Sequence, residues 1–271
     1  MTNYLDTLSG QAKANAATLV AQMKVRGITS PFTHAAVLGV ISKESEFIPQ
    51  SENMNYTLNK KTGKPGWKRI MEIWSGIPES VAKTLENNPK GLGDYVYGPV
   101  RKPDLGNGDG EGYKYRWRGY NQLTGKANYK KYGGLVGVDL VANPDKLNDP
   151  KVAADVAIEF FKNGIKSLAT LGKLSQYNAT NINDFKTAKD SLGAIYHVNA
   201  GTGHTAAHIN ADVTGGKAKA ESRLDDLMNF VKGTVGDIGD TLKNNSGKIV
   251  MFFFALSIVA GGIVLYNNAK G

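Results

Sequence analysis

The sequence of 271 residues contains no cysteine. This absence excludes disulfide bonds, thiolate metal sites and cysteine nucleophiles, so carboxylates become the natural candidates for catalysis. Metal-binding histidine patterns are also scarce. His204 and His208 have the i, i+4 spacing of zinc ligands on a helix, but the glutamate of a metalloprotease motif and a nearby third ligand are missing. We therefore expect neither a metal ion nor another cofactor.

Long apolar runs are missing too, with one exception near the C-terminal end. Residues 249–266 read IVMFFFALSIVAGGIVLY, 18 residues without a charge. As a helix they would span about 27 Å, close to the roughly 30 Å hydrocarbon core of a bilayer. We predict a transmembrane helix over 249–266, preceded by a linker over 232–248 and followed by a short tail over 267–271. Residues 1–10 show no signal-peptide pattern, and we expect none.

Acidic residues are fewer than basic ones. Asp and Glu number 24 against 33 Lys and Arg, which gives a net charge of +9. Residues 1–248 carry +8 of this charge, because Lys270 alone among the charged residues lies beyond them. The excess predicts an anionic partner, and by itself it fits nucleic acid, acidic lipid or a negatively charged cell-wall polymer equally well.

The part before residue 232 is predicted to be a mainly helical domain. Ser30 followed by Pro31 is a helix-start signal, and Asn148 or Asp149 before Pro150 is another. Apolar residues with helical spacing predict four helices, over 30 to about 43–47, 148–163, 188–197 and 218–231. Between them, residues 87–119 are rich in glycine, proline, aspartate and asparagine, which predicts a long loop.

Two glutamates stand close together at the end of the first predicted helix. Glu44 lies in ISKESEF, and Glu52 comes eight residues later, past Pro49 and in a predicted turn. Hydrolysis of a glycosidic bond needs such a pair, because one carboxyl protonates the leaving oxygen and the other activates water or stabilises the oxocarbenium ion. The alternative interpretation is two solvated carboxylates without a catalytic role.

Residues 110–133, GEGYKYRWRGYNQLTGKANYKKYG, alternate aromatic with basic side chains. Aromatic faces beside cations and amides suit sugar rings, which stack and form hydrogen bonds. The same composition suits single-stranded nucleic acid, so the pattern alone does not separate the two ligands.

This segment resembles the signature of the family 19 glycoside hydrolases, a chitinase-like group that includes many bacteriophage endolysins. ISKESEF followed by ENMNY resembles the endolysin segment that runs from a catalytic glutamate to a second one. ANPDKLNDPKVAADVAIEFF is similar to the helix after the loop, and AIYHVNAGTGH to a late segment that lines the cleft. The resemblance covers most of residues 30–230. It implies a lysozyme-like fold of two helical lobes for residues 1–231, which hydrolyses β-1,4 glycosidic bonds with inversion.

The resemblance also implies roles for single residues. Glu44 matches the general acid, and Glu52 matches the second carboxylate that is proposed as the base. Glu111 and Asp109 lie where chitinase-branch members place their base, so they are alternative second carboxylates. The residues expected to bind substrate are Thr124, which is also associated with holding the water, and Gln122, Asn128, Tyr129, Asn199, Tyr115 and Arg118.

Lys43 is a departure from the family, which usually has histidine there. We expect its side chain to point to solvent, because a cation in the cleft would suit a general acid poorly.

These features predict a membrane-anchored, peptidoglycan-degrading hydrolase of lysozyme type that is encoded by a phage. The expected partners are peptidoglycan glycan strands, a lipid bilayer through 249–266 and other virion membrane proteins, but not nucleic acid. The anchor is expected to cross the virion internal membrane or the host inner membrane once, for wall penetration during infection or for lysis of the host. The alternatives are a chitinase and a catalytically inactive, membrane-tethered wall-binding protein of a virion.

Overall fold

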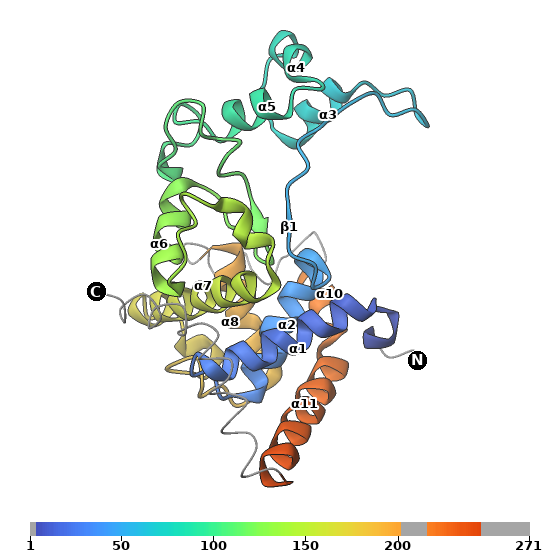
Figure 1. Ribbon diagram of the computed structural model, residues 1–271. Helices are drawn as coiled ribbons and strands as arrows, with labels where there is room; N and C mark the ends of the chain where they lie inside the picture. The colour runs from blue at the N-terminus through green and yellow to red at the C-terminus, as the bar shows by residue number, and fades with distance from the viewer. Residues whose placement is uncertain (1–3, 202–215, 245–271) are drawn as a thin grey trace, which may run out of the picture. The chain divides into compact units, whose positions relative to one another are not determined.

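The computed structural model describes residues 4–201 and 216–244, and the chain is mainly helical there, as predicted (Figure 1). The α-helices are α1 (Gly10–Val25), α2 (Pro31–Ser45), α3 (Gly66–Ile73), α4 (Glu79–Leu85), α5 (Pro89–Val96), α6 (Lys126–Val136), α7 (Pro150–Thr170), α8 (Ala188–Ala200), α10 (Gly216–Glu221) and α11 (Leu224–Asn244). The short elements are the 3-10 helices η1 (Tyr4–Thr7), η2 (Pro103–Leu105), η3 (Pro144–Asn148) and η4 (Ser175–Tyr177), and the antiparallel strands β1 (Gln50–Ser51) and β2 (Arg118–Gly119). Internal contacts divide the chain into units 1–228 and 229–271, and the core and the site described below belong to the first.

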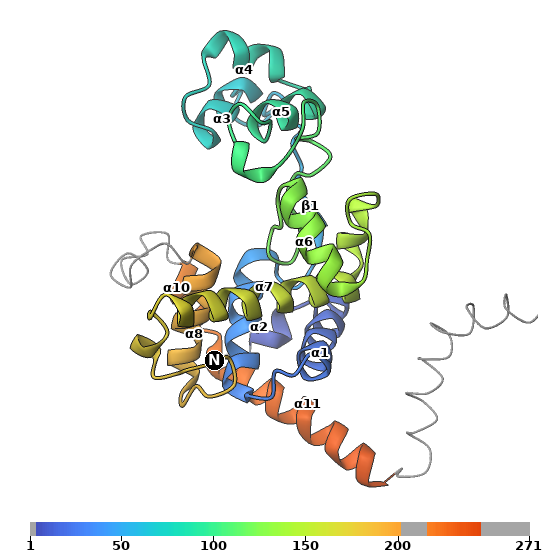
Figure 2. The ribbon, with the colours of Figure 1, turned by 90° about the vertical axis from the view of Figure 1, so that its left-hand side faces the viewer.

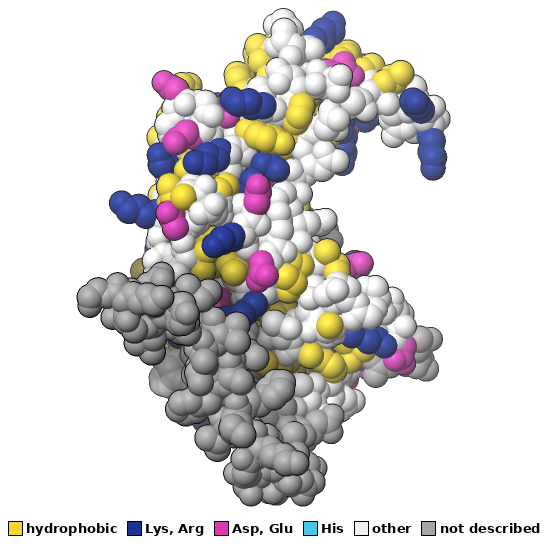
Figure 3. Space-filling view, viewed as in Figure 1, with side chains coloured by type: hydrophobic (Ala, Val, Ile, Leu, Met, Phe, Trp, Pro, Cys, Tyr) yellow, Lys and Arg dark blue, Asp and Glu magenta, His cyan; other side chains and the backbone are white. Residues whose placement is uncertain are grey.

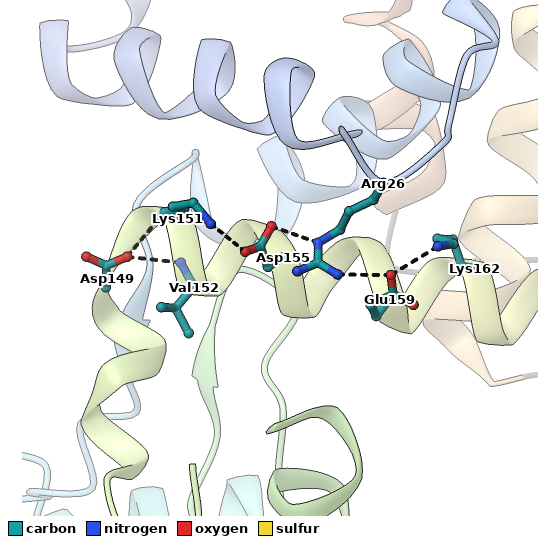
Figure 4. Close-up of polar contacts among 7 residues, drawn as sticks. All are labelled: Arg26, Asp149, Lys151, Val152, Asp155, Glu159 and Lys162. Atoms are coloured by element: carbon teal, nitrogen blue, oxygen red, sulfur yellow. Dashed lines mark hydrogen bonds and ion pairs between the residues drawn. The ribbon is translucent and has the colours of Figure 1, made fainter. Parts of the chain in front are cut away.

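The helix starts follow the predicted capping signals. The Ser30 hydroxyl accepts a hydrogen bond from the Thr33 backbone N–H at 3.4 Å, and α2 begins at Pro31. Asp149 does the same for α7, where its carboxylate accepts from two backbone N–H groups at 2.9 Å each (Figure 4). Because a cap satisfies N–H groups that have no partner inside the helix, these residues set the first turn.

Other segments differ from their predictions. Residues 87–119 contain α5 and η2 rather than one continuous loop. The single helix predicted over 218–231 is two helices, and Arg223 at the break donates to the Ser42 carbonyl at 2.9 Å in the last turns of α2. The predicted linker 232–248 is helical as far as Asn244, the end of α11.

The predicted transmembrane helix over 249–266 lies outside the described residues. Within residues 4–201 and 216–244, no helix combines the length and the apolarity needed to cross a bilayer.

The core of the first unit surrounds α2. Every residue from Thr33 to Ser42 is buried, so this helix is covered on all sides. It packs on α1, α8 and α10, while α7 packs on α1, α6 and α8. Figures 1 and 2 both show α3, α4 and α5 apart from this group, at the far end of the β1 segment. They form a lobe with an apolar cluster of its own, made of Met54, Ile70, Ile77, Ala82, Leu85, Leu92 and Val96.

A group of charges fastens α1 to α7 (Figure 4). Arg26, just after α1, donates to Asp155 at 2.8 Å and to Glu159 at 3.2 Å, both on α7. Lys151 and Lys162 contact the same two carboxylates at 2.9 and 3.0 Å. Burial by itself would raise the pKa of Asp155, but the hydrogen bonds from Arg26 and Lys151 outweigh burial and lower that pKa. The contacts hold α7 in place, and α7 contributes one wall of the pocket described next.

Candidate functional site

A pocket of about 300 Å³ lies at the C-terminal end of α2. The residues that line it are Glu44, Leu105, Asn121, Gln122, Leu123, Thr124, Asn128, Phe160 and Asn199. They come from α2, η2, the segment between β2 and α6, α6, α7 and α8, which are far apart in the sequence. Apart from one carboxylate, the polar groups are amides and a hydroxyl. Such neutral donors and acceptors suit a ligand that is rich in hydroxyl and amide groups.

The carboxylate of Glu44 is held from three directions. Its Oε1 accepts from Asn199 Nδ2 at 3.0 Å and from Lys43 Nζ at 2.9 Å, and its Oε2 accepts from Gln122 Nε2 at 3.2 Å. The side chain is 12% exposed, so the carboxyl group is largely shielded and still faces the pocket. Two amides from α8 and the segment before α6 therefore fix its orientation.

The expectation that Lys43 points to solvent is wrong. Its ammonium group forms an ion pair with Glu44, the residue that follows it in α2. The carboxylate is partly withdrawn from water, and an opposite charge at 2.9 Å is strongly attracted there because the local dielectric constant is lower than in bulk water.

The segment that carries Gln122 is a tight hairpin. Arg118 and Leu123 exchange two backbone hydrogen bonds, at 3.1 and 3.0 Å. Gln122 has φ +57°, a left-handed conformation that is costly for a residue with a side chain and that is often found at functional sites. Thr124 Oγ1 donates to the Gln122 carbonyl at 2.9 Å, and Asn128 Nδ2 donates to the Thr124 carbonyl at 2.8 Å. The hairpin thus presents Gln122 and Thr124 to the pocket in a fixed geometry.

The structure brings five of the predicted site residues to this one pocket. They are Glu44, Gln122, Thr124, Asn128 and Asn199.

Glu52 lies just after β1 and does not line the pocket. Its backbone N–H donates to the Trp117 carbonyl at 3.0 Å, which continues the pairing of β1 with β2. The residue is 9% exposed, and its Oε2 accepts from the Tyr97 hydroxyl at 2.8 Å. Burial raises the pKa of Glu52, and side-chain hydrogen bonds from Tyr97 and Trp117 offset only part of the rise. Glu52 is therefore a carboxyl group that holds its proton more tightly than an exposed glutamate.

The alternative second carboxylates lie in the loop before β2, and neither lines the pocket. Glu111 forms an ion pair with Lys126 at 2.8 Å and accepts from the Gly108 N–H at 2.8 Å. The hydrogen bond from Lys126 is the main cause that lowers the pKa of Glu111. Asp109 is exposed.

Within the described part of the chain, no group of three or more histidine, cysteine or acidic side chains is placed to hold a metal ion, and His204 and His208 lie outside that part.

Three residues that were predicted to bind substrate are inside the domain instead. Arg118 is 2% exposed, and its guanidinium donates to Asp145 at 2.8 Å, to the Lys114 carbonyl at 2.8 Å and to the Tyr129 hydroxyl at 3.0 Å. The hydroxyl of Tyr129 in turn donates to the Arg116 carbonyl at 2.7 Å. The third residue, Tyr115, packs edge-on against the Tyr129 ring and is equally buried. Because these polar groups are already paired internally, we reassign the three residues from substrate contact to positioning of the hairpin.

Sequence reasoning missed four of the lining side chains, Leu105, Asn121, Leu123 and Phe160. Asn121 directly precedes Gln122 in the aromatic and basic segment, and that adjacency was the available signal. Phe160 lines the pocket while its neighbour Phe161 is fully buried. Two consecutive phenylalanines on a helix carry no sign of which one faces a cavity.

We expect Arg118→Met to lower the free energy of unfolding by about 2–4 kcal/mol, because buried carbonyl and hydroxyl groups would lose their donor. Urea denaturation followed by circular dichroism measures this loss. The control is Asp145→Asn, which weakens the ion pair with Arg118 by changing its exposed partner. This change is expected to cost at most about 1 kcal/mol. An Arg118→Met variant of unchanged stability but raised KM would restore the substrate-binding interpretation.

The chain was also compared with known proteins. No protein-family model matches it. It is 32% identical over 126 residues to a protein of Haemophilus influenzae named "Glycosyl hydrolase family 19 domain-containing protein". The aligned part covers 44% of this chain and 56% of that protein, so the chain spans little more than half the length of this relative. The similarity supports the relationship to glycoside hydrolases of family 19 that the sequence motifs indicate.

Proposed function

We propose that the chain is a peptidoglycan-degrading glycoside hydrolase, a muramidase or lysozyme-type endolysin with the two-lobed fold of its family. The observation that carries the proposal is the arrangement around Glu44. A single carboxyl group is held by Asn199 and Gln122 in a pocket whose remaining polar groups are neutral. At about 300 Å³ the pocket has the size of a small-ligand site, which suits one sugar unit of a longer glycan.

In the proposed reaction Glu44 donates a proton to the leaving glycosidic oxygen. A water molecule, held by the Thr124 hydroxyl, attacks the anomeric carbon from the opposite face and inverts it. A second carboxylate accepts the proton that the water loses, so proton uptake and release balance. Glu52 is the first candidate for this base, because its burial makes it a stronger base than an exposed glutamate. Glu111 and Asp109 are the alternatives.

The charge distribution favours peptidoglycan, as part of an anionic wall, over neutral chitin. Residues 54–102, which include the α3–α5 lobe, carry nine lysines and arginines against four acidic residues, and Figure 3 shows basic side chains spread over this lobe. A surface of this sign attracts a polyanion and raises its rate of encounter with the site.

We further propose that residues 249–266 anchor the chain in a membrane, once and near its C-terminal end. The 18 uncharged residues support this, as does the basic charge of the preceding part. The anchored enzyme would belong to a phage, in the virion internal membrane beside other virion proteins or in the host inner membrane.

A second candidate function is a catalytically inactive, tethered wall-binding protein. The ion pair of Lys43 with Glu44 favours it, because the ion pair engages the one carboxylate that lines the pocket.

Mass spectrometry of digestion products tests the proposal. The full chain, held in detergent micelles, is incubated with purified peptidoglycan and, separately, with chitin oligomers. We expect muropeptides with new reducing ends from peptidoglycan, and the inverted anomer as the first product in proton NMR spectra. Cleavage of chitin alone would indicate a chitinase, and wall binding without products would indicate the inactive protein.

A further inference from the structure

The side chain of Asn121 is unusual within the pocket. Its Nδ2 and Oδ1 atoms are both shielded from water, and neither has a hydrogen-bond partner among the described residues. The other amides of the pocket are engaged. Gln122 and Asn199 donate to Glu44, and Asn128 donates to the Thr124 carbonyl. A buried polar group without a partner costs about 1–3 kcal/mol, so an amide that leaves both atoms unpaired beside a pocket calls for an explanation.

The backbone around Asn121 is rigid although its amide group is unpaired. The residue lies in the hairpin that the Arg118 and Leu123 backbone bonds close, directly before the left-handed Gln122. Below the hairpin, the buried guanidinium of Arg118 fixes the strand that leads into it. The hairpin therefore holds the Asn121 backbone at the pocket wall, while no hydrogen bond within the described part of the chain opposes a turn of its side chain toward a ligand.

We propose that Asn121 binds the acetamido group of an N-acetylated sugar in the pocket and makes the enzyme selective for N-acetylated glycan. The inference rests on the proposed function. An asparagine amide offers a donor and an acceptor, whereas the C=O and N–H of an acetamido group point in opposite directions because the secondary amide is trans. Asn121 Nδ2 can therefore donate one hydrogen bond to the acetamido C=O, the group that a deacetylated sugar lacks. Because the Asn121 amide is already out of water, pairing it requires no removal of water from the protein side.

A glycan without the acetyl group presents an amine in its place. The amine supplies no carbonyl, so the amide of Asn121 keeps an unpaired donor. A site built to pair a substrate group discriminates strongly against a substrate that lacks it, because its own polar atoms then stay unpaired. We expect kcat/KM for N-acetylated peptidoglycan to exceed that for the same peptidoglycan after enzymatic N-deacetylation by about 10- to 100-fold.

The test compares the two substrates for the unmutated full chain and for Asn121→Leu, which has a similar shape and no polar atoms. We expect the variant to lose the preference, through a lower kcat/KM on the N-acetylated substrate alone. Its Tm should be unchanged or higher by about 2–4 °C, since an unpaired amide is removed. Asn121→Ala, which leaves space instead of filling it, is expected to lose the preference as well.

Ser191→Ala is the matched control. The Ser191 hydroxyl is likewise buried without a partner among the described residues, but it belongs to α8 and does not line the pocket. We expect it to keep the substrate preference. The inference is overturned if Asn121→Leu and Asn121→Ala keep the preference, or if they lower kcat/KM equally on both substrates. If the unmutated chain cleaves neither substrate, the proposed function itself has failed, which is a different result.

Discussion

Replacing Glu44 by glutamine is expected to lower kcat on purified peptidoglycan by about 10²–10⁴, the usual contribution of a general acid. Glutamine has the shape of glutamate, and its oxygen can still accept the hydrogen bond from Asn199. It has no proton to give to the leaving oxygen. Because the loss affects the transition state rather than substrate binding, KM should change by only a few-fold. Initial rates of turbidity loss in a wall suspension, at several wall concentrations, separate the two parameters.

A matched control for this variant is Glu79→Gln on α4. Glu79 is also paired with a lysine, Lys83, at 2.6 Å, but it is exposed and lies outside the pocket. The control should retain the unmutated rate, and both variants should have the unmutated Tm within about 2–4 °C. Equal rates for Glu44→Gln and the unmutated chain would remove Glu44 from the role of general acid.

The helices could be predicted where the sequence carries local signals. Ser30 before Pro31 and Asp149 before Pro150 cap helices because a side-chain oxygen and a following proline act within one turn. The helix α1 was missed. Its buried residues are interspersed with asparagine, glutamine and lysine, so its apolar face is weak in the sequence and is completed only by packing on α7 and α2.

The site could be predicted in part, because a motif fixes residue types but not the direction of each side chain. The motif-derived amides of Gln122, Asn128 and Asn199 do reach the pocket of Glu44. Tyr115 and Tyr129 do not, because an aromatic ring suits a sugar face and a protein core equally, and packing between α6 and α7 decides between them. The direction of Lys43 is not fixed by the motif either, because it depends on how Asn199 and Gln122 orient the carboxylate of the neighbouring Glu44.

Glu52→Gln is expected to have two opposite effects. If Glu52 is the base, the variant loses the acceptor for the proton of water, and kcat should fall by about 10²–10⁴. Stability should change in the other direction. Since the pKa of Glu52 is raised by folding, the folded chain binds the proton more tightly than the unfolded chain. The free energy of unfolding therefore falls as the pH rises from the usual glutamate pKa to the raised one. Glutamine does not ionise and avoids this loss.

Thermal melting across pH measures the second effect. Above the raised pKa of Glu52 we expect Glu52→Gln to melt at a higher temperature than the unmutated chain. Below the usual glutamate pKa, where Glu52 is protonated in both states, the two curves should converge. A variant that is less stable at every pH would show that the carboxylate of Glu52 stabilises the fold, contrary to the direction of its pKa shift.

The acid limb of the pH–rate profile distinguishes Glu52 from its alternatives. A base must be ionised, so kcat/KM should fall as the pH drops through the pKa of the residue that acts as the base. Tyr97→Phe removes the hydroxyl that donates to Glu52 Oε2 at 2.8 Å and stabilises its ionised form. This change should move the limb to higher pH if Glu52 is the base. It should leave the limb in place if the base is Glu111, whose pKa is lowered by Lys126 and whose hydrogen bonds do not involve Tyr97. An unmoved limb together with an active Glu52→Gln variant would transfer the role to Glu111 or Asp109, and Glu111→Gln and Asp109→Asn would then decide between those two.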